Sequence, residues 1–549
     1  MRTAHKVATA LATASSLMLL GAPIASSSSA GTTGPEETYL VLYKQGASSG
    51  GAASRISDAG GTLVVNHSQI GVVVAKSTQS DFALKLQADS RIEGVAVSNQ
   101  PVAQVGPLEA DSHDGETNPP ATPDNLDSLQ WHMRQIQAPE AHVITGGSPA
   151  VVVGDIDTGV DKDHPDLVQN IDFTKSVSCE SGFPNQNPAA WDDHNGHGTH
   201  TTGTMAAADN GFGITGVAPN VKIAAIKSSL DSGFFFVHMV VCSFMWAGGA
   251  EFDNPTTSGI DFPATVGPRV DVTNNSYFMD PFLYNCRNDP AQRLLWKAAQ
   301  RAILFAHSAG VTNVAAIGND GDDRAHPISD SGSPNPGTPI DRVITNACVV
   351  VPVEVPGVIG VTGTSNRRQT DDNDDPDDYL KSFFSAFGVG VADVAAPSGD
   401  SVFGRTPEAL NGRVLSTYPQ ELPCTRTLKD GPAPDPEPPT STYCYLQGTS
   451  MASPHAAGVA ALIISRYGDL NTPQNGKMRP SAVEAYMQQT ADAQPCPTAL
   501  PADPRGFFTR PTGEVQECQG GQSYNSWYGA GQINALRAVT HDTGQAATP

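Results

Sequence analysis

Beyond about residue 128, short apolar runs alternate with longer segments of helical spacing. The runs are hydrophobic on both faces, as in strands buried within a parallel sheet, and they span residues 150–157, 221–227, 270–276, 312–318, 358–364 and 391–397. The clearest helical pattern covers residues 291–309 and ends before Gly310. Its apolar stripe consists of Leu295, Ala298, Ala302, Phe305 and Ala309. The alternation predicts an α/β fold with a doubly wound, mostly parallel sheet, whose working residues lie at the carboxyl ends of the strands.

A smaller pattern of strands precedes this region. Residues 38–44 predict one strand, residues 62–77 predict two strands around a turn, and residues 92–105 predict a last strand. Residues 79–87 have helical spacing. We therefore expect a small α+β domain over residues 31–105.

The segment between the two patterns is polar, acidic and rich in proline. It covers residues 106–127 and is typical of an exposed linker that proteases cut. Length alone suggests three or four domains for 549 residues, but one large domain over residues 128–549 behind processed segments fits as well. Two loops interrupt that domain, an acidic one at 371–378 and a proline-rich one at 431–441. We expect the acidic loop to be a solvated surface, with Ca²⁺ binding as the alternative.

The first 30 residues have the pattern of an export signal. Arg2 and Lys6 precede the mostly apolar run 7–25, and small residues follow. Cleavage after Ala30 is expected and cleavage after Ala25 is the alternative, while an uncleaved anchor is the rival interpretation. Since no later segment has about 18 uninterrupted apolar residues, we expect a secreted protein without membrane contact once the signal is removed.

Charge and cysteine content narrow the classes of function. The chain has 32 Lys and Arg against 56 Asp and Glu, a net charge of −24, which disfavours nucleic acid and anionic membranes as partners. All eight cysteines lie after residue 178 and none forms a C-x-x-C pair, so disulfides are expected rather than a zinc ribbon. Eight cysteines allow 105 pairings. Cys424 with Cys444 and Cys496 with Cys518 are the pairs we expect.

Three short segments contain candidate catalytic residues. Asp157 ends an apolar strand just before Thr158 and Gly159 and is placed to orient a histidine, although an Asp there is also a common turn or capping residue. His197 precedes a helix and is suited to act as a general base. The spacing of His194, His197 and His200 also suggests a metal site, but H-E-x-x-H is absent.

Ser450 lies at the start of a long apolar helix, after Gly448 and Thr449. The free N–H groups and partial positive charge of a helix N-terminus stabilise an oxyanion formed when a serine attacks a carbonyl. The alternative is a helix N-cap, which is a common role for serine. A lipase-like site would have G-x-S-x-G, which the sequence around Ser450 lacks.

Together the motifs D-T-G at 157–159, H-G-T-H at 197–200 and G-T-S-M-A-S-P at 448–454 resemble those of the subtilisin-like serine proteases, the subtilase family. The resemblance implies a serine-type endopeptidase that acts on proteins or peptides through an acyl-enzyme, without a catalytic metal. It also implies that Asn319, in N-V-A-A-I-G-N-D-G, stabilises the oxyanion together with the backbone N–H of Ser450. The segment 523–539 is similar to the closing G-x-G-x-I-N of the family.

The resemblance gives residues 31–105 a role as well. Their size and pattern match the inhibitor-like N-terminal propeptide of the family. By analogy this domain assists folding and blocks the site as an intramolecular inhibitor until cleavage in the linker, so the chain is expected to be an autoprocessed zymogen. The mature enzyme is expected to be a monomer.

The substrate groove departs from the family pattern. Ser276 is followed by Tyr277, Phe278 and Met279 where many relatives have Leu-Gly-Gly. Ile317, just before Gly318, is larger than the usual Ala. By analogy Ser276, Tyr277, Ile317 and Gly318 contact substrate, and the bulky side chains predict a narrower or more selective groove. A processing protease for a few partner proteins is therefore an alternative to a broad degradative enzyme, and an inactive binding protein on the same fold is the remaining one.

Calcium is the one ion that the resemblance suggests. Asp166 and Asn210, the latter in the loop 208–214, occupy the place of the family's tight Ca²⁺ site. Carboxylate and amide oxygens suit this hard cation. The alternative is ordinary helix-cap and turn chemistry.

Overall fold

The computed structural model of the chain describes residues 33–99, 126–252, 265–369, 378–430, 441–471, 476–501, 506–509 and 512–543. The predicted signal at 1–30 and nearly all of the linker and the two loops lie outside these residues. Among the described helices none is long and apolar enough to span a bilayer.

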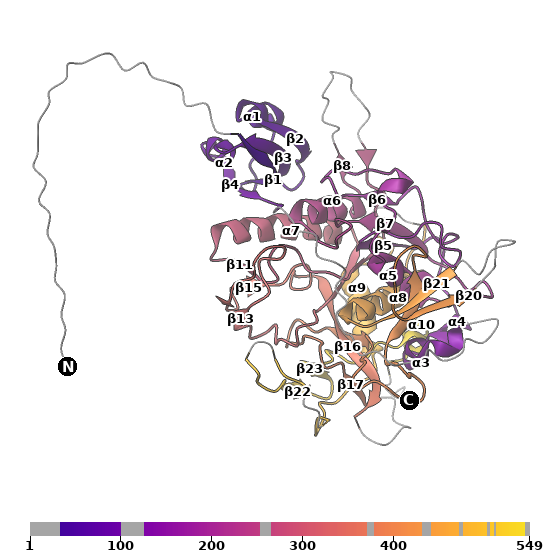
Figure 1. Cartoon of the computed structure of the whole chain (residues 1–549). Helices are drawn as coiled ribbons and strands as arrows, with labels where there is room; N and C mark the ends of the chain where they lie inside the picture. The colour runs from indigo at the N-terminus through magenta and orange to yellow at the C-terminus, as the bar shows by residue number, and fades with distance from the viewer. Residues whose placement is uncertain are drawn as a thin grey trace, which may run out of the picture.

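An eight-stranded sheet forms the centre of the larger part of the molecule (Figure 1). The strand order is β17-β16-β12-β10-β5-β7-β6, and β18 also pairs with β16. Its strands are β5 Val152–Asp157, β6 Val177–Ser178, β7 Lys222–Lys227, β10 Val272–Asn275, β12 Thr312–Ala316, β16 Val358–Arg368, β17 Tyr379–Lys381 and β18 Val394–Pro397. Every pair is parallel except β16–β17. The doubly wound α/β prediction and its six strands are therefore confirmed, and the short edge strands β6 and β17 are additional.

Helices cover both faces of this sheet because its strands are apolar on both sides. On one face Val152 and Ile156 share a core with α6, Val237–Ala247, and α7, Pro290–Ser308. On the other face Val153 shares a second core. The helices of that face are α3 Trp131–Gln135, α4 Ala138–His142, α5 His197–Ala206, α8 Thr449–Tyr467, α9 Pro480–Gln489 and α10 Ala535–Thr540. The helix predicted over 291–309 is confirmed as α7, and Asp289 caps its first turn.

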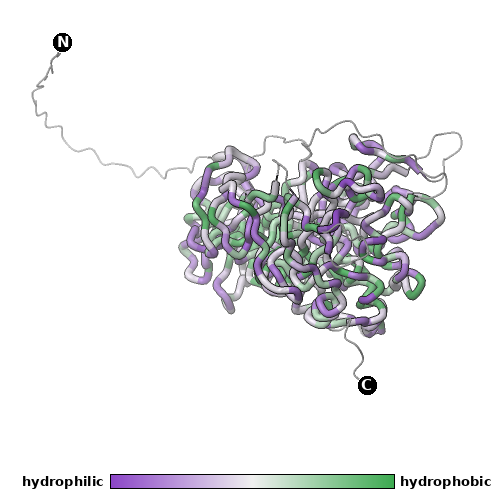
Figure 2. Tube along the Cα trace, turned by 90° about the horizontal axis from the view of Figure 1, so that it is seen from below, coloured by the Kyte–Doolittle hydropathy of each residue, from purple (hydrophilic) through white to green (hydrophobic). Residues whose placement is uncertain are grey.

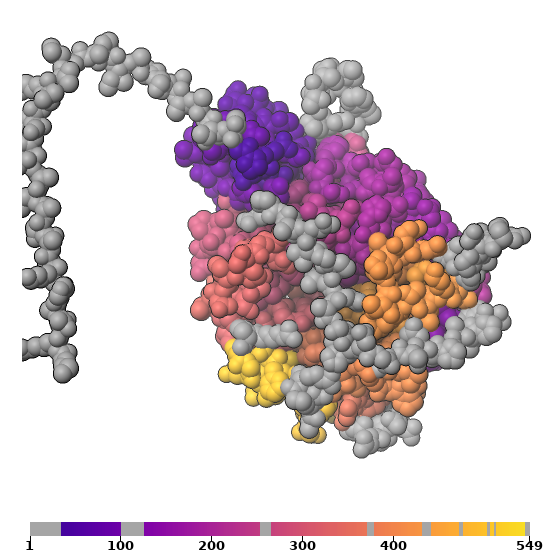
Figure 3. Space-filling model, in the orientation of Figure 1, coloured from indigo at the N-terminus to yellow at the C-terminus, as the bar shows by residue number. Residues whose placement is uncertain are grey.

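A small antiparallel domain precedes the main sheet. Its strands β1 Thr33–Tyr43, β2 Gly61–His67, β3 Val72–Gln79 and β4 Ile92–Val97 lie in the order β2-β3-β1-β4. The helices α1, Ala52–Asp58, and α2, Phe82–Gln87, pack on one face. The predicted α+β pattern is confirmed, although the sequence did not predict α1. The other face joins the core of α6 and α7, so this domain is seated against one side of the larger part (Figure 3).

Short hairpins and four disulfides complete the fold. The remaining elements are η1 Asp127–Leu129, η2 Pro188–Ala190, β8 Glu251–Phe252, β9 Thr265–Val266, β11 Asn285–Cys286, β13 Ser329–Asp330, β14 Arg342–Val343, β15 Cys348–Val349, β19 Val414–Tyr418, β20 Thr427–Asp430, β21 Ser441–Leu446, β22 Gly520–Gly521 and β23 Tyr524–Asn525. The expected disulfides Cys424–Cys444 and Cys496–Cys518 are confirmed. The other two are Cys179–Cys242 and Cys286–Cys348.

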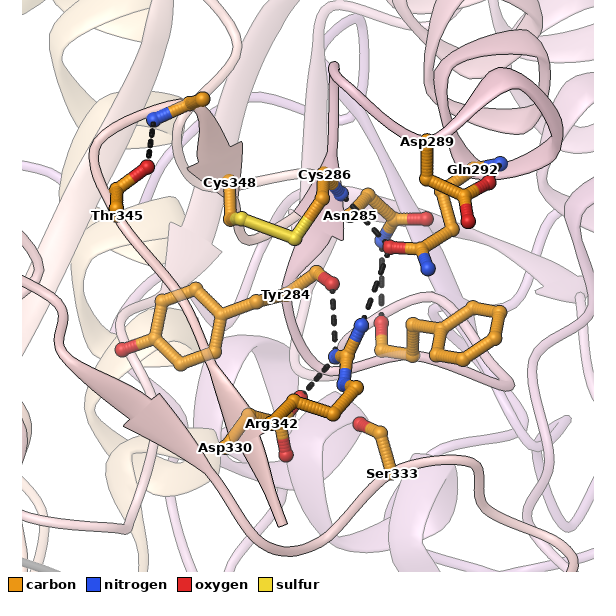
Figure 4. Close-up of a disulfide and its surroundings, with 12 residues drawn as sticks. Tyr284, Asn285, Cys286, Asp289, Gln292, Asp330, Ser333, Arg342, Thr345 and Cys348 are labelled. Atoms are coloured by element: carbon orange, nitrogen blue, oxygen red, sulfur yellow. Dashed lines mark hydrogen bonds and ion pairs between the residues drawn. A yellow bond between two sulfur atoms is a disulfide. The ribbon is translucent and has the colours of Figure 1, made fainter. Parts of the chain in front are cut away.

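The Cys286–Cys348 bridge ties the segment before α7 to an insertion that follows β12 (Figure 4). Nearby, Arg342 forms an ion pair with Asp330 across the β13–β14 hairpin and donates to the carbonyl of Tyr284 at 3.0 Å. The insertion is therefore fastened by a covalent bond and by a largely buried ion pair.

Hydrophilic segments lie mostly along the outer loops of the molecule, and apolar segments run through its middle (Figure 2).

Candidate active site

Asp157, His197 and Ser450 come from a strand of the sheet and from two helices that cover one of its faces. Asp157 is the last residue of β5, His197 is the first residue of α5, and Ser450 lies in the first turn of α8. Nδ1 of His197 lies 2.7 Å from Oδ1 of Asp157. Nδ1–H therefore donates to the carboxylate, which leaves Nε2 as the ring atom that can accept a proton.

Two glycines allow the strand and the helix to come this close. A Cβ on Gly198 would lie 2.1 Å from the carbonyl oxygen of Gly159, so only glycine fits at this crossing. Gly159 also has a φ of +110°, which favours glycine. The backbone N–H of Gly198 donates to the hydroxyl of Thr158 at 2.9 Å. The glycines of D-T-G and H-G-T-H are thus required for the same physical reason, because they allow His197 to approach Asp157.

Asp193 anchors the start of α5, and its sequence context did not mark it as a site residue. Its Oδ1 accepts the backbone N–H groups of Asn195 and Gly196 and the hydroxyl of Thr158. Its Oδ2 accepts the N–H and the hydroxyl of Thr199. These bonds satisfy donors of the first helical turn, which otherwise have no partner within the helix. An acidic residue shortly before a helix start was the available signal.

Opposing effects set the pKa of His197. Burial lowers this pKa, but the charge and hydrogen bond of Asp157, followed by the charges of Asp155 and Asp193, together raise it above its usual value. The side chain of Asp157 is fully buried. A buried carboxylate beside an imidazole favours the protonated imidazole, which is the form that a general base reaches during a proton transfer.

Ser450 does not cap α8. The N-cap residue is Gly448, which lacks a side chain to form a cap, so the N-cap alternative for Ser450 is excluded. The hydroxyl of Ser450 donates to the carbonyl of Ser276 at 3.2 Å, and the hydroxyl of Ser276 donates to the carbonyl of Ser450 at 2.9 Å. Ser450 is partly exposed. Its hydroxyl is thus held at the surface of the site by a single backbone partner.

Two N–H donors meet above Gly448. Oδ1 of Asn319 accepts the backbone N–H and the hydroxyl of Thr449, at 2.8 and 2.9 Å, so the amide group of Asn319 has one fixed orientation. Nδ2 and Oδ1 of Asn319 lie 3.4 and 3.7 Å from the point that a Cβ on Gly448 would occupy, and the backbone N of Ser450 lies 3.7 Å from it, so both groups border the same space. This arrangement suits an oxyanion beside the hydroxyl of Ser450.

Arg324 clamps the loop that carries Asn319, a role that sequence reasoning missed. Its guanidinium is fully buried, with Nε donating to the carbonyl of Ile317 at 3.1 Å and Nη2 donating to Asp320 at 2.8 Å. A Cβ on Gly318 would lie 2.1 Å from Nη2. Because Arg324 follows several acidic residues, its sequence context is typical of a solvated surface charge.

Most of the side chains predicted to shape the groove are buried. Tyr277 is 8% exposed and stacks on Phe235 with 4.2 Å between ring centroids. Met279 and Ile317 are fully buried in the core beneath. Phe278, in the same segment after β10, is half-buried. Substrate contact by Ser276, Tyr277, Ile317 and Gly318 stays a prediction, and the bulk of Tyr277 and Ile317 lies mainly in the core.

The residues predicted to hold calcium are arranged for hydrogen bonds. Oδ1 of Asp166 accepts from Nδ2 of Asn210, and Oδ2 accepts from the backbone of Ile214 and from the hydroxyl of Tyr443. Burial raises the pKa of Asp166 to about 7. Three donors take three of the roughly four acceptor sites of this carboxylate, so Asp166 and Asn210 are arranged as a hydrogen-bonded pair and not as a cage of oxygen ligands for Ca²⁺. Nor do the described residues contain a cluster of three His, Cys, Asp or Glu side chains placed for a metal.

A chelator tests this conclusion. We expect a change from EDTA to excess CaCl₂ to shift the thermal midpoints of the wild type and of Asp166→Asn by the same amount, within about 1 °C, because only an ion held at Asp166 would make the two shifts differ. The measurement is differential scanning fluorimetry of the wild type and of Asp166→Asn. An EDTA-induced fall in the wild type that is absent from Asp166→Asn would contradict the expectation, whereas a fall in both proteins would locate an ion elsewhere.

Comparison with known proteins agrees with the geometry. The model of the subtilase family (peptidase S8) matches residues 148–531. Subtilisin DY of Bacillus licheniformis is 31% identical over 326 residues, which cover 59% of this chain and 80% of that protein. Thermitase of Thermoactinomyces vulgaris is 30% identical over 344 residues, covering 62% of this chain and 83% of that protein.

The fold has solved relatives as well. The epidermin leader peptide processing serine protease of Staphylococcus aureus superposes with a TM-score of 0.60 at 20% identity, covering 93% of this chain and all of that one. Fervidolysin of Fervidobacterium pennivorans superposes with a TM-score of 0.56 at 21% identity, covering 92% of this chain and 61% of that one. At this level of identity the likeness concerns the fold alone.

Proposed function

Because the chain belongs to the subtilase family of serine-type endopeptidases, we propose that it is a secreted enzyme, made as a zymogen, that cuts peptide bonds through an acyl-enzyme. The observation that carries the proposal is the 2.7 Å contact between Nδ1 of His197 and Asp157, formed beside the helix that bears Ser450. Nδ1 of His197 is held by the carboxylate, and Nε2 is the ring atom that we propose exchanges protons with Ser450.

The proposed roles follow from these contacts. His197 takes the proton of Ser450 as Oγ attacks the peptide carbonyl, and Asp157 holds the ring in one tautomer and stabilises its charged form. Nδ2 of Asn319 and the N–H of Ser450 stabilise the tetrahedral oxyanion. His197 then protonates the leaving amine, and water hydrolyses the acyl-enzyme by the same proton transfers.

Removal of the Asn319 amide gives one quantitative test. We expect Asn319→Ala to lower kcat by about 10² to 10³, with KM little changed, because the amide bonds the oxyanion and not the ground-state carbonyl. The measurement is steady-state kinetics on a chromogenic peptide. Asn313→Ala serves as a control, since Asn313 is a buried amide on β12, the strand that precedes the loop of Asn319, and its side chain accepts from Thr273. Equal losses of kcat in both variants would contradict the assignment.

We further propose that residues 31–105 are the inhibitory propeptide, between a signal at 1–30 and a maturation linker at 106–127, ahead of a catalytic domain at 128–549. Contacts of the small domain with α7 support this proposal. Lys297 forms an ion pair with Glu93, and Nη1 of Arg301 donates to the carbonyls of Tyr43 and Ile70 at 2.9 and 3.0 Å.

A second contact involves the start of α6, where the hydroxyl of Ser98 lies 2.8 Å from Nδ1 of His238 and accepts the backbone N–H of His238. The last described residues of the small domain are thus fixed to a helix of the larger part. N-terminal sequencing of the protein in the culture medium tests the boundaries. We expect a mature N-terminus within 106–127, and a mature protein that begins before residue 100 would contradict them.

A selective processing protease is the second candidate. Phe278, which is half-buried and stands where many relatives have glycine, supports it, and one structural neighbour is an epidermin leader peptide processing protease. A peptide library separates the two, because a processing enzyme shows strong preference at several positions and a degradative enzyme shows a nearly flat profile.

A further inference from the structure

The proposed reaction leaves one buried carboxylate beside the candidate triad unused. Asp155 is 1% exposed and lies two residues before Asp157 on β5. Its Oδ2 accepts the hydroxyls of Thr201 and Thr202 at 2.7 and 2.8 Å, and its Oδ1 accepts Nδ2 of Asn274 at 2.9 Å. A charge this deep is costly unless several donors compensate it, so a buried Asp with three donors requires a reason.

The donors belong to the elements that carry the candidate catalytic residues. Thr201 and Thr202 follow His197 on α5. Asn274 is the register partner of Asp155 on the neighbouring strand β10. Oδ1 of Asn274 in turn accepts the hydroxyl of Ser453 on α8 at 2.7 Å. One chain of side-chain hydrogen bonds therefore runs from α5 through β5 and β10 to α8.

This series of hydrogen bonds connects α5 and α8, which the contacts of the triad itself join only loosely. The contact of His197 with Asp157 fixes one end of α5, and the hydroxyl of Ser450 bonds a backbone carbonyl of the loop after β10. The Asp155 network fixes both helices against the same two strands, one turn beyond His197 and one turn beyond Ser450. A misplacement of about 1 Å between reacting groups can cost 10² in rate, so this anchoring has a direct consequence for catalysis.

We propose that Asp155 is a positioning residue of the enzyme, whose carboxylate holds α5 and, through Asn274, α8, and thereby sets His197 against Ser450. The inference rests on the proposed function. Asp155 touches neither substrate nor reacting atoms, so its effect reaches the reaction through Thr201, Thr202 and Asn274. The proposal predicts that substitutions in this hydrogen-bond network lower kcat and leave KM nearly unchanged, because they alter the geometry of the proton transfer.

Two threonines of α5 provide a matched test. Thr202 and Thr204 are both buried, and Thr→Val is nearly isosteric at each. The hydroxyl of Thr202 bonds Asp155, whereas that of Thr204 bonds the carbonyl of His200 within the helix. We expect Thr202→Val to lower kcat about tenfold with KM within about threefold, and Thr204→Val to leave both near wild type. Thermal midpoints of both variants show whether any loss merely follows stability.

Asp155→Asn adds a readout that a purely structural role would not move. The charged groups around His197 are Asp157, Asp155 and Asp193, and each raises the pKa of His197. The groups facing Asp155 are Asp157 on its own strand and the uncharged Thr201, Thr202 and Asn274. Burial, followed by the charge of Asp157, raises the pKa of Asp155 to about 7, so Asp155 carries its charge mainly toward the alkaline end of the acid limb. His197 must be neutral to act as a base, so removal of that charge moves the acid limb of kcat/KM to lower pH. The loss in kcat of the Asp155→Asn, Thr202→Val double variant should be smaller than the product of the single losses, because both changes break one contact.

The outcomes separate this inference from the function on which it rests. Equal kcat for Thr202→Val and Thr204→Val, or losses in proportion to the thermal midpoints, would overturn the positioning role. So would an Asp155→Asn enzyme with wild-type kcat and an unmoved acid limb. Proteolysis that persists in Ser450→Ala would instead overturn the proposed function, whatever the threonine variants show.

Discussion

Ser450→Ala should fold as the wild type does and lose about 10⁶ in kcat. The change removes the attacking oxygen, and no other group in the site can take its place. It should cost little stability, because the hydroxyl is partly exposed and has a single backbone partner, the carbonyl of Ser276. The measurement is hydrolysis of casein and of a chromogenic peptide at matched enzyme concentration, with the thermal midpoint recorded for each protein.

Ser465→Ala is the matched control. Ser465 lies on the same helix, and its hydroxyl accepts the backbone N–H of Ser148 at 3.0 Å. We expect this variant to keep wild-type kcat. Ser450→Ala should also keep its N-terminal segment, and added wild-type enzyme should remove that segment if the linker is accessible. Undiminished proteolysis in purified Ser450→Ala would contradict the assignment of the nucleophile.

Much of the fold was predictable because its signals are local. Strands buried on both faces, such as 221–227, are continuous apolar runs, and the amphipathic helix α7 has a clear stripe and a stop. The short helix α1 was missed because Ala52–Asp58 contains only two buried residues, Ala52 and Ile56. The disulfide pairs whose partners are 20 and 22 positions apart in sequence were found, whereas Cys179–Cys242 and Cys286–Cys348 join segments more than 60 positions apart.

The site was predictable only where a motif surrounds the residue. Asp157, His197 and Ser450 each lie in a short motif, and the three motifs in this order indicate a single kind of chemistry. Asp155, Asp193 and Arg324 have no such context, since an isolated acidic or basic residue usually indicates a cap or a solvated surface. Their importance depends on burial and on partners up to 119 residues away in the chain, as for Asp155 with Asn274. Residues this far apart in sequence come into contact only in the folded protein.

Asp157→Asn should lower kcat by about 10⁴ while leaving KM nearly unchanged. An asparagine fits the space and can still accept from Nδ1–H of His197 and from the backbone N–H of Thr158, both of which now bond Oδ1. What it removes is the negative charge, so the imidazolium formed during proton transfer loses its main stabilising partner. The variant keeps the shape of Asp157 and removes its charge, and its amide N–H can also donate to Nδ1 of His197, which leaves the ring in the tautomer that cannot accept the Ser450 proton.

The Asp157→Asn variant should also shift the pH profile of kcat/KM in a defined direction. The charge of Asp157 raises the pKa of His197, so its removal lowers that pKa and moves the acid limb of kcat/KM to lower pH. The plateau above the limb should fall at the same time, because a less basic imidazole takes the Ser450 proton less readily. Asp271→Asn is the control, since Asp271 is a buried carboxylate that bonds the N–H of Val152 at the opposite ends of β10 and β5. Its plateau and its limb should both stay at wild-type values. A lower plateau with an unmoved limb in Asp157→Asn would mean that Asp157 acts on something other than the protonation of His197.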